Sequence, residues 1–120
     1  MRKVVLKLGG SLIVRKWVAD FPLTYDAIRR EGPRFIRYST IARLADEVRR
    51  AMEVEDLRLV LINGAGSFGH YLVMRRVDPE TIHRSAAFLN REVYNVFRVK
   101  GVPVRRAHPW NCCYYLGRGR

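Results

Sequence analysis

The sequence contains few cysteines and no long apolar run. Its two cysteines, Cys112 and Cys113, are adjacent, a spacing that fits neither a disulfide framework nor a CxxC metal pair. No stretch approaches the roughly 20 apolar residues of a membrane-spanning helix. At the start of the chain the apolar run is too short, and the surrounding residues are too charged, for a signal peptide. These absences predict a cytoplasmic protein with no membrane partner.

Lysine is also scarce, although the chain is strongly basic. The 120 residues carry 23 Lys and Arg against 11 Asp and Glu, a net charge of +12. The only lysines are Lys3, Lys7, Lys16 and Lys100, so a lysine near a motif is more informative than an arginine. The positive charge indicates an anionic substrate, a polyanion or an acidic partner. Nucleic acid is disfavoured, because no recognised nucleic-acid-binding module accompanies the charge.

Periodicity predicts a single α/β domain. An apolar content of 48% is enough for a core and excludes wholesale disorder. Apolar runs predict strands over residues 3–8 and 57–62, the second buried on both faces as in a parallel sheet. Between them, residues 40–53 form an amphipathic helix, capped by Ser39 or Thr40, that crosses from one strand to the next.

Further elements are predicted after the second strand. A helix covers residues 67–76, and another runs from Asp78, an N-cap residue, to a stop at Gly101. A third strand follows over residues 102–107, in which Pro103 must lie at the start or on an edge because it has no N–H.

Both of the first two strands run directly into glycine. Gly9-Gly10-Ser11 follows the first strand, and Asn-Gly-Ala-Gly-Ser-Phe-Gly-His, ending at His70, follows the second. In a parallel sheet both turns lie at the carboxyl edge, where open α/β folds bind ligands. Glycine allows the backbone to approach a ligand closely, and free N–H groups in such turns bind anions, most often phosphate. The sequence therefore predicts a phosphate-binding turn with His70 beside it.

Residues 13–37 show no regular period. Trp17, Phe21, Tyr25 and Phe35 are scattered among charges and prolines. Two interpretations stay open: an irregular excursion or short helices that form a flap over the site, or a surface loop anchored by a few aromatic side chains.

A dinucleotide site is a weaker alternative. Gly64, Gly66 and Gly69 match the pattern G-x-G-x-x-G between a strand and a helix. Glu92 stands at about the right distance for a ribose-binding acid, but within a predicted helix and not at a strand end. The first strand also carries a different turn, which this pattern does not explain.

Taken together, the two turns resemble those of the amino acid kinase family. That family opens with K-x-G-G-S and a lysine shortly after, matched by residues 7–11 and by Lys16. Its second turn reads roughly H-G-[GA]-G-[SA]-F-G-H, matched by residues 64–70, with Asn63 in place of the first histidine. The F-G-H ending is specific to the phosphate-accepting branch, and the closest likeness is to the isopentenyl phosphate kinases.

The resemblance implies that the first turn serves the phosphoryl donor. Phosphoryl transfer needs mainly positioning and stabilisation of phosphate oxygens by N–H groups and cations. Lys16 matches a lysine that stabilises charge on the phosphoryl group in flight. The positions matching residues that contact the phosphates of ATP, with its Mg²⁺, are Lys7, Gly9, Gly10, Ser11 and Gly66.

The resemblance also implies an acceptor side. Gly64, Ala65 and Gly66 match the turn that lies between donor and acceptor phosphates. His70 matches the histidine that holds the phosphate of the acceptor and so selects a phosphorylated substrate over a free alcohol or carboxylate. Together with Lys7 and Lys16, His70 is thus a candidate catalytic residue.

The implied fold is a three-layer αβα sandwich of the amino acid kinase type, of which residues 1–120 form the N-terminal, acceptor-binding half. The implied reaction is the ATP-dependent phosphorylation of isopentenyl phosphate to isopentenyl diphosphate, a step of isoprenoid biosynthesis. Because the nucleotide-binding half is not matched, we expect activity to need a complementary C-terminal half or a second copy. The alternative is a non-catalytic remnant that binds phosphate or a polyanion through the same turns.

Each candidate also has a structural interpretation. Lys7 fits an ordinary edge-strand lysine, Lys16 a solvated lysine in a loop, and His70 a helix-start residue bonded to backbone. His83 and His108 have no partners at metal-ligand spacing and are interpreted as structural or surface residues.

That the acceptor carries a prenyl tail is implied by the resemblance alone. Apolar residues on the helices after His70 suit a prenyl chain and are equally explained as core: Leu72, Val73, Leu89 and Val93. Other acceptors of the family, such as a nucleoside monophosphate, acetylglutamate or a phosphonate, stay open.

Overall fold

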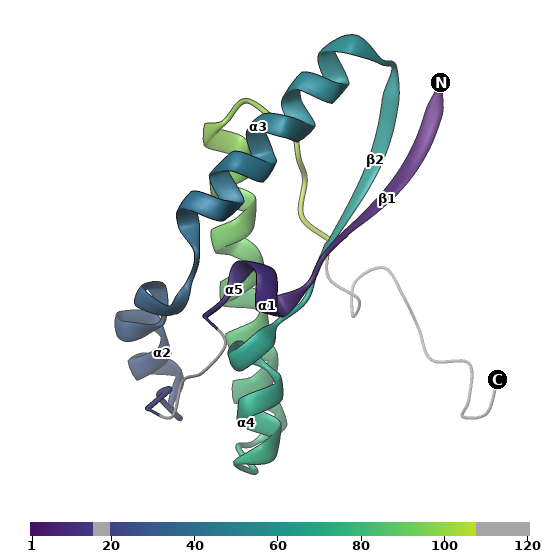
Figure 1. Cartoon of the computed structure of the whole chain (residues 1–120). Helices are drawn as coiled ribbons and strands as arrows, with labels where there is room; N and C mark the ends of the chain where they lie inside the picture. Colours follow the sequence, from purple (N-terminus) through teal and green to yellow (C-terminus); the bar gives the residue numbers. More distant parts are fainter. Residues whose placement is uncertain (16–19, 108–120) are drawn as a thin grey trace, which may run out of the picture.

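A computed structural model describes residues 1–15 and 20–107. Figure 1 shows a two-stranded sheet beside a group of helices, so the chain is a mixed α/β domain. The elements, with η for 3₁₀ helices, are β1 (Arg2–Leu8), α1 (Gly10–Ile13), α2 (Tyr25–Glu31), η1 (Gly32–Phe35), α3 (Tyr38–Val54), β2 (Leu57–Asn63), η2 (Gly66–Phe68), α4 (His70–Met74) and α5 (Pro79–Val99).

The strands β1 and β2 are parallel neighbours joined through α3, which confirms the predicted strand–helix–strand unit. Their register pairs Arg2 with Leu57 at one end and Leu8 with Asn63 at the other. Because both strands end level with each other, the glycine turns that follow them start at the same edge of the sheet.

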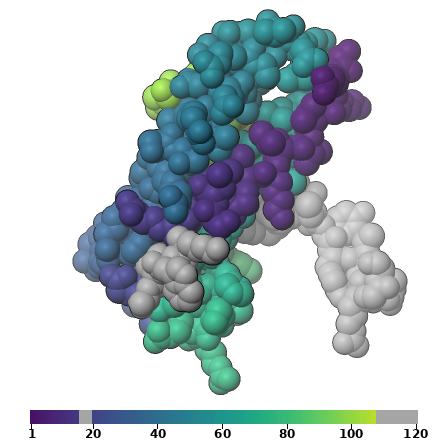
Figure 2. Space-filling model, viewed as in Figure 1, coloured from purple at the N-terminus to yellow at the C-terminus, as the bar shows by residue number. Residues whose placement is uncertain are grey.

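Among the described residues, helices cover only one face of the sheet. Side chains alternate along β1 and β2 between covered and exposed positions. On the open face Val5, Val60 and Ile62 are 67%, 55% and 46% exposed, and β1 lies at the molecular surface in Figure 2. The prediction that the second strand is buried on both faces is therefore wrong. The apolar run is continuous, but within residues 1–15 and 20–107 helices pack on one side of it only.

The core lies between the covered face of the sheet and the helices. Leu8 of β1 packs with buried side chains of α3 and α5, and half-buried side chains from both strands surround them. The fully or almost fully buried members from the two long helices are Ile41, Ala45, Leu89, Val93 and Phe97. Neither these helices nor any other helix in the described part of the chain is long and apolar enough to cross a membrane.

The helix α3 begins earlier than its sequence predicts. Its N-cap is Arg37, without a side-chain cap, and not Ser39 or Thr40. Two contacts explain the shift. The Arg37 N–H donates to the Ile13 carbonyl at 2.8 Å, and the Tyr38 hydroxyl donates to the Glu92 carboxylate at 2.6 Å. Tertiary contacts with α1 and α5 therefore set the start of the helix.

The helix α5 confirms its predicted ends. Asp78 is the N-cap and accepts a hydrogen bond from the Thr81 N–H at 3.0 Å. This bond, with the hydroxyl of Thr81, lowers the pKa of the Asp78 carboxyl. At the other end Gly101 has φ +87, a left-handed conformation that favours glycine after a helix.

The predicted helix over residues 67–76 is divided in two. The chain forms a 3₁₀ turn, η2, and then α4, with Gly69 between them at φ −130 and ψ −67. Gly69 donates to the Gly66 carbonyl and accepts from Val73, so it closes one turn and opens the next.

The predicted third strand, residues 102–107, is not formed. Pro103 has no N–H, and residues 103–107 make no main-chain hydrogen bond with β1 or β2. The segment instead packs through side chains. Val102 is buried in the core, and Arg106 bonds to residues of α5.

The sequence of residues 13–37 is interpreted either as an irregular excursion or short helices, or as a surface loop anchored by aromatic side chains. The structure contains short helices there, α2 and η1. Val14 and Ile36 form an antiparallel bridge, and Phe21 and Phe35 are buried in the core with ring centroids 5.2 Å apart. These aromatic side chains anchor the segment. Trp17 lies outside the described residues.

Arg76 has a left-handed backbone conformation at the end of α4, a position that glycine occupies at the end of α5. α4 and α5 end in the same motif, in which Val77 bonds to Leu72 and Val102 to Phe97. The left-handed position is glycine in α5, but in α4 it is Arg76, with φ +58.

We predict that Arg76→Gly raises the free energy of unfolding by about 0.5–1 kcal/mol, because a Cβ is disfavoured in this conformation. Urea denaturation measures the change. Arg76→Ala, which removes the same side chain but keeps Cβ, is the matched control and should not gain stability. Equal effects of the two substitutions would contradict the prediction.

Candidate functional site

The two glycine turns are in direct contact. The Gly64 N–H donates to the Leu8 carbonyl at 2.7 Å, which continues the sheet pairing into the turns. A Cβ placed on Gly10 would lie 2.5 Å from the backbone nitrogen of Gly66, and one on Gly64 would lie 2.7 Å from the nitrogen of Gly10. No side chain fits between backbones at such distances, so the glycines at 10 and 64 are required by this approach.

The second turn has the geometry of an anion-binding concavity. Ala65 is in the right-handed helical region, at φ −102 and ψ −21, and Gly66 is in the left-handed region, at φ +53. A right-handed residue followed by a left-handed one directs successive N–H groups into one concave space. Such an arrangement suits phosphate or carboxylate oxygens.

The N–H groups of both turns are without an acceptor among the described residues. In the first turn these are Gly9, Gly10 and Ser11, and in the second turn they are Ala65, Gly66 and Ser67. A Cβ placed on Gly9 would have no atom within 4 Å, so the backbone there faces open space. The turns therefore bring N–H donors together, and at Gly9 they adjoin open space.

The buried side chain of Phe68 holds the second turn to the core. Phe68 is 0% exposed and meets the ring of Phe21 edge to face, with centroids 4.9 Å apart. A Cβ on Gly69 would lie 2.9 Å from the Cβ of Ala65. Both residues of this Phe-Gly pair thus have a structural role in closing the turn.

Lys7 and His70 lie next to the turns, with exposed side chains. Lys7 pairs with Ile62 in the sheet register and belongs to the open face. His70 is the first residue of α4. Its imidazole makes no hydrogen bond with another described residue. Within the described part of the chain, the predicted bond from the His70 side chain to the backbone is therefore not present.

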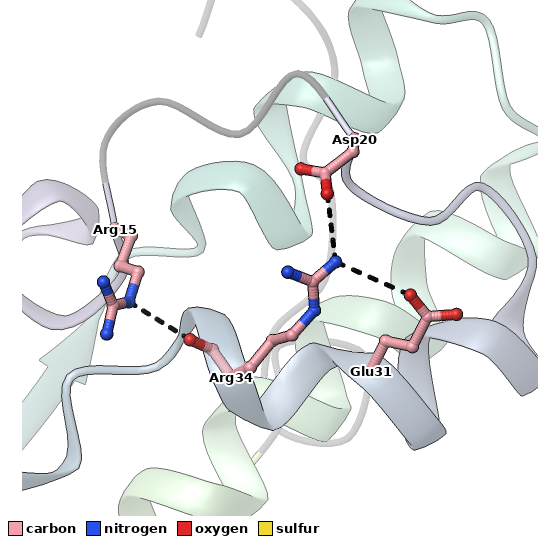
Figure 3. Close-up of polar contacts among 4 residues, drawn as sticks. All are labelled: Arg15, Asp20, Glu31 and Arg34. Carbon is pink, nitrogen blue, oxygen red and sulfur yellow. Dashed lines mark hydrogen bonds and ion pairs between the residues drawn. The ribbon is translucent and has the colours of Figure 1, made fainter.

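Lys16 lies outside the described residues. The nearest described residues on either side of it, Arg15 and Asp20, both contact Arg34, as Figure 3 shows. The Arg15 Nε donates to the Arg34 carbonyl and the Arg34 guanidinium donates to the Asp20 carboxylate, both at 3.1 Å. The second bond lowers the pKa of Asp20. Glu31 is a weaker ion-pair partner of Arg34, at 3.6 Å.

A chain of polar side chains behind the second turn was not identified from the sequence. The Arg106 Nε donates to the Asn90 side-chain oxygen at 3.0 Å, and the Asn90 amide donates to the Asn63 side-chain oxygen at 2.7 Å. The Asn63 amide donates to the Gly64 carbonyl at 3.0 Å. The one sequence signal for it is the polar residue Asn63 at the end of an apolar strand.

The residues considered for binding a ribose or a prenyl chain are mostly engaged elsewhere in the fold. Glu92 bonds to Tyr38 from within α5, and not from a strand end as a ribose-binding acid would. Of the residues considered for a prenyl chain, Leu72, Leu89 and Val93 are core residues, whereas Val73 is 58% exposed. Among the described residues, no group of three or more His, Cys, Asp or Glu side chains is placed to hold a metal ion.

We predict that Gly10→Ala lowers the free energy of unfolding by about 1–3 kcal/mol, because the new methyl group forces the two turns apart. The measurement is urea denaturation of the full chain. Gly9→Ala is the matched control: the space around Gly9 is open, and its φ of −63 is suited to alanine. If both variants unfold at the wild-type urea concentration, the two turns are not in contact in solution.

Comparison with protein-family models gives no match, and comparison with curated proteins gives none either.

Proposed function

We propose that the chain takes part in the ATP-dependent phosphorylation of isopentenyl phosphate, within a three-layer sandwich of the amino acid kinase type. One observation carries the proposal. Two glycine turns meet at the carboxyl edge of a parallel sheet, and their N–H groups have no acceptor among the described residues. A reaction between two phosphate groups needs such a row of donors at its centre.

The reaction would be an in-line transfer. An oxygen of the acceptor phosphate attacks the γ-phosphorus of ATP, the bond from that phosphorus to the β–γ bridging oxygen breaks, and ADP leaves with the electron pair. The protein supplies little covalent chemistry. Its task is to hold two anionic groups close together and to stabilise the charge on the equatorial oxygens.

The donor side is assigned to the first turn. The N–H groups of Gly9, Gly10 and Ser11 would bind phosphate oxygens of ATP, and Gly66 would face them from the second turn. Lys7 and Lys16 would add positive charge, Lys16 to the phosphoryl group in transfer. Mg²⁺ would neutralise part of the phosphate charge, and it would arrive bound to the nucleotide, since Mg²⁺ in such sites relies largely on phosphate oxygens and water.

The acceptor side is assigned to the second turn and α4. Of the N–H groups of Gly64, Ala65 and Gly66, that of Gly64 already donates to the Leu8 carbonyl and is not free to bind a phosphate. Ala65 and Gly66 are therefore the donors proposed for the acceptor phosphate. His70 would donate a further hydrogen bond from the start of α4 and select a phosphate over a neutral alcohol.

The open face of the sheet favours a fold in which further strands and helices cover it. Val5, Val60 and Ile62 are largely exposed there, and the two strands of the described part have free edges. In the proposed fold, further strands and a second helical layer, from a complementary C-terminal half or from a second copy, would cover these surfaces.

A second candidate function is non-catalytic binding of phosphate or a polyanion. The net charge of +12 and the exposed side chains of Arg98 and Arg105 favour it. The two functions differ in what salt does to binding. Affinity for a polyanion falls steeply with salt concentration, because counterions are released, whereas a small phosphate held by backbone N–H groups is less sensitive.

We predict that the full chain binds isopentenyl phosphate and that His70→Ala weakens this binding by at least about tenfold, the effect of one hydrogen bond to a charged group. Isothermal titration calorimetry measures the dissociation constants. His83→Ala, a change at a histidine of α5 outside the turn, is the control and should bind as the wild type does.

Transfer is followed separately by ³¹P NMR of the full chain with MgATP and isopentenyl phosphate. His70-dependent binding with formation of the diphosphate supports the kinase. Binding that ignores His70, falls steeply with salt and is lost in Arg98→Ala or Arg105→Ala supports the polyanion function. Absence of any binding of isopentenyl phosphate would overturn the kinase function.

A further inference from the structure

The polar chain behind the second turn runs in one direction, from Arg106 to the Gly64 carbonyl. It links the segment after α5, through Asn90 in α5 and Asn63 at the end of β2, to the turn. A second bond, from the Arg106 guanidinium to the Ala87 carbonyl at 2.9 Å, fixes the arginine on α5. The three side chains are all part-buried, so water competes only partly for these bonds.

Arg106 and the Gly64 carbonyl both favour the same orientation of the two amides. A guanidinium can only donate hydrogen bonds, so Asn90 must present its oxygen to Arg106. The Asn90 nitrogen then faces Asn63, which must accept through its own oxygen. This leaves the Asn63 nitrogen as the donor to the Gly64 carbonyl. The Gly64 carbonyl can only accept, so it requires the same direction from the other end, and the two ends of the chain reinforce each other.

The Gly64 carbonyl and the Ala65 N–H belong to the same peptide group. The chain has no cis peptide bond among the described residues, and in a trans peptide the C=O and N–H point in opposite directions. The bond that Asn63 makes with the Gly64 carbonyl therefore also directs the Ala65 N–H away from Asn63. A reversed peptide would instead place a carbonyl oxygen where an anion is expected.

We propose that Arg106 and Asn90 are positioning residues, which act through Asn63 to hold the Gly64–Ala65 peptide with its N–H toward the bound phosphate. The inference rests on the proposed function, because it names the groups that orient a donor of that site. Arg106 has a second effect. No carboxylate of the described residues lies within ion-pair distance of it, so none of these residues neutralises its charge, which favours a nearby anion.

The first test is the substitution Asn90→Asp. A carboxylate still accepts from Arg106 but cannot donate, so Asn63 must turn its nitrogen toward residue 90 and its oxygen toward the Gly64 carbonyl. We expect the affinity for inorganic phosphate to fall by about tenfold or more, as for a lost hydrogen bond to a charged group. Asn95→Asp adds the same charge to an exposed position of α5 and should change the affinity little.

The second test separates positioning from charge. Arg106→Leu and Arg105→Leu remove one positive charge each from neighbouring residues, but only Arg106 belongs to the polar chain. In ¹⁵N–¹H spectra of the full chain without ligand, we expect Arg106→Leu to shift the Asn63 side-chain amide and the Ala65 backbone amide. Arg105→Leu should leave both in place. Circular dichroism of each variant establishes that it is folded.

The proposal is overturned if folded Arg106→Leu leaves both resonances at their wild-type positions, or if Asn90→Asp binds phosphate as tightly as Asn95→Asp does. The failure of the proposed function looks different. A wild-type chain that binds no phosphate would refute the anion site, while the two resonances would still respond to Arg106→Leu.

Discussion

The contact between the two glycine turns is the constraint on which the rest of the site depends. Gly10 and Gly66 approach so closely that a Cβ on Gly10 would lie 2.5 Å from the Gly66 nitrogen. This approach is possible only because β1 and β2 are parallel and end level with each other. Once the turns meet, N–H groups without an acceptor among the described residues lie on two adjoining segments, and neither turn alone would offer an anion as many donors.

The surrounding structure holds that contact from several directions. The ring of Phe68 anchors the second turn in the core, and the Gly64 N–H joins it to the end of β1. The bonds from Arg106 through Asn90 and Asn63 hold the Gly64 carbonyl of the same turn. The turn is therefore restrained both by apolar burial at Phe68 and by a directed set of hydrogen bonds at Gly64.

The features that the sequence predicts well are local. An apolar run ending in glycine indicated both strands and both turns, and Asp78 and Gly101 marked the ends of α5. The errors concern contacts between distant parts of the chain. Residues 102–107 have the composition of a strand but pair with none. The bond between Asn90 and Asn63 joins residues 27 apart, and no local pattern reveals such a contact.

The most direct test of the account is a titration of the ¹⁵N-labelled full chain with inorganic phosphate, followed through its backbone amide resonances. We predict that the largest changes occur together in both turns, at Gly9–Ser11 and at Ala65–Ser67, and that they saturate with one dissociation constant. Changes confined to the arginine-rich segment 98–106, with both turns unaffected, would contradict it.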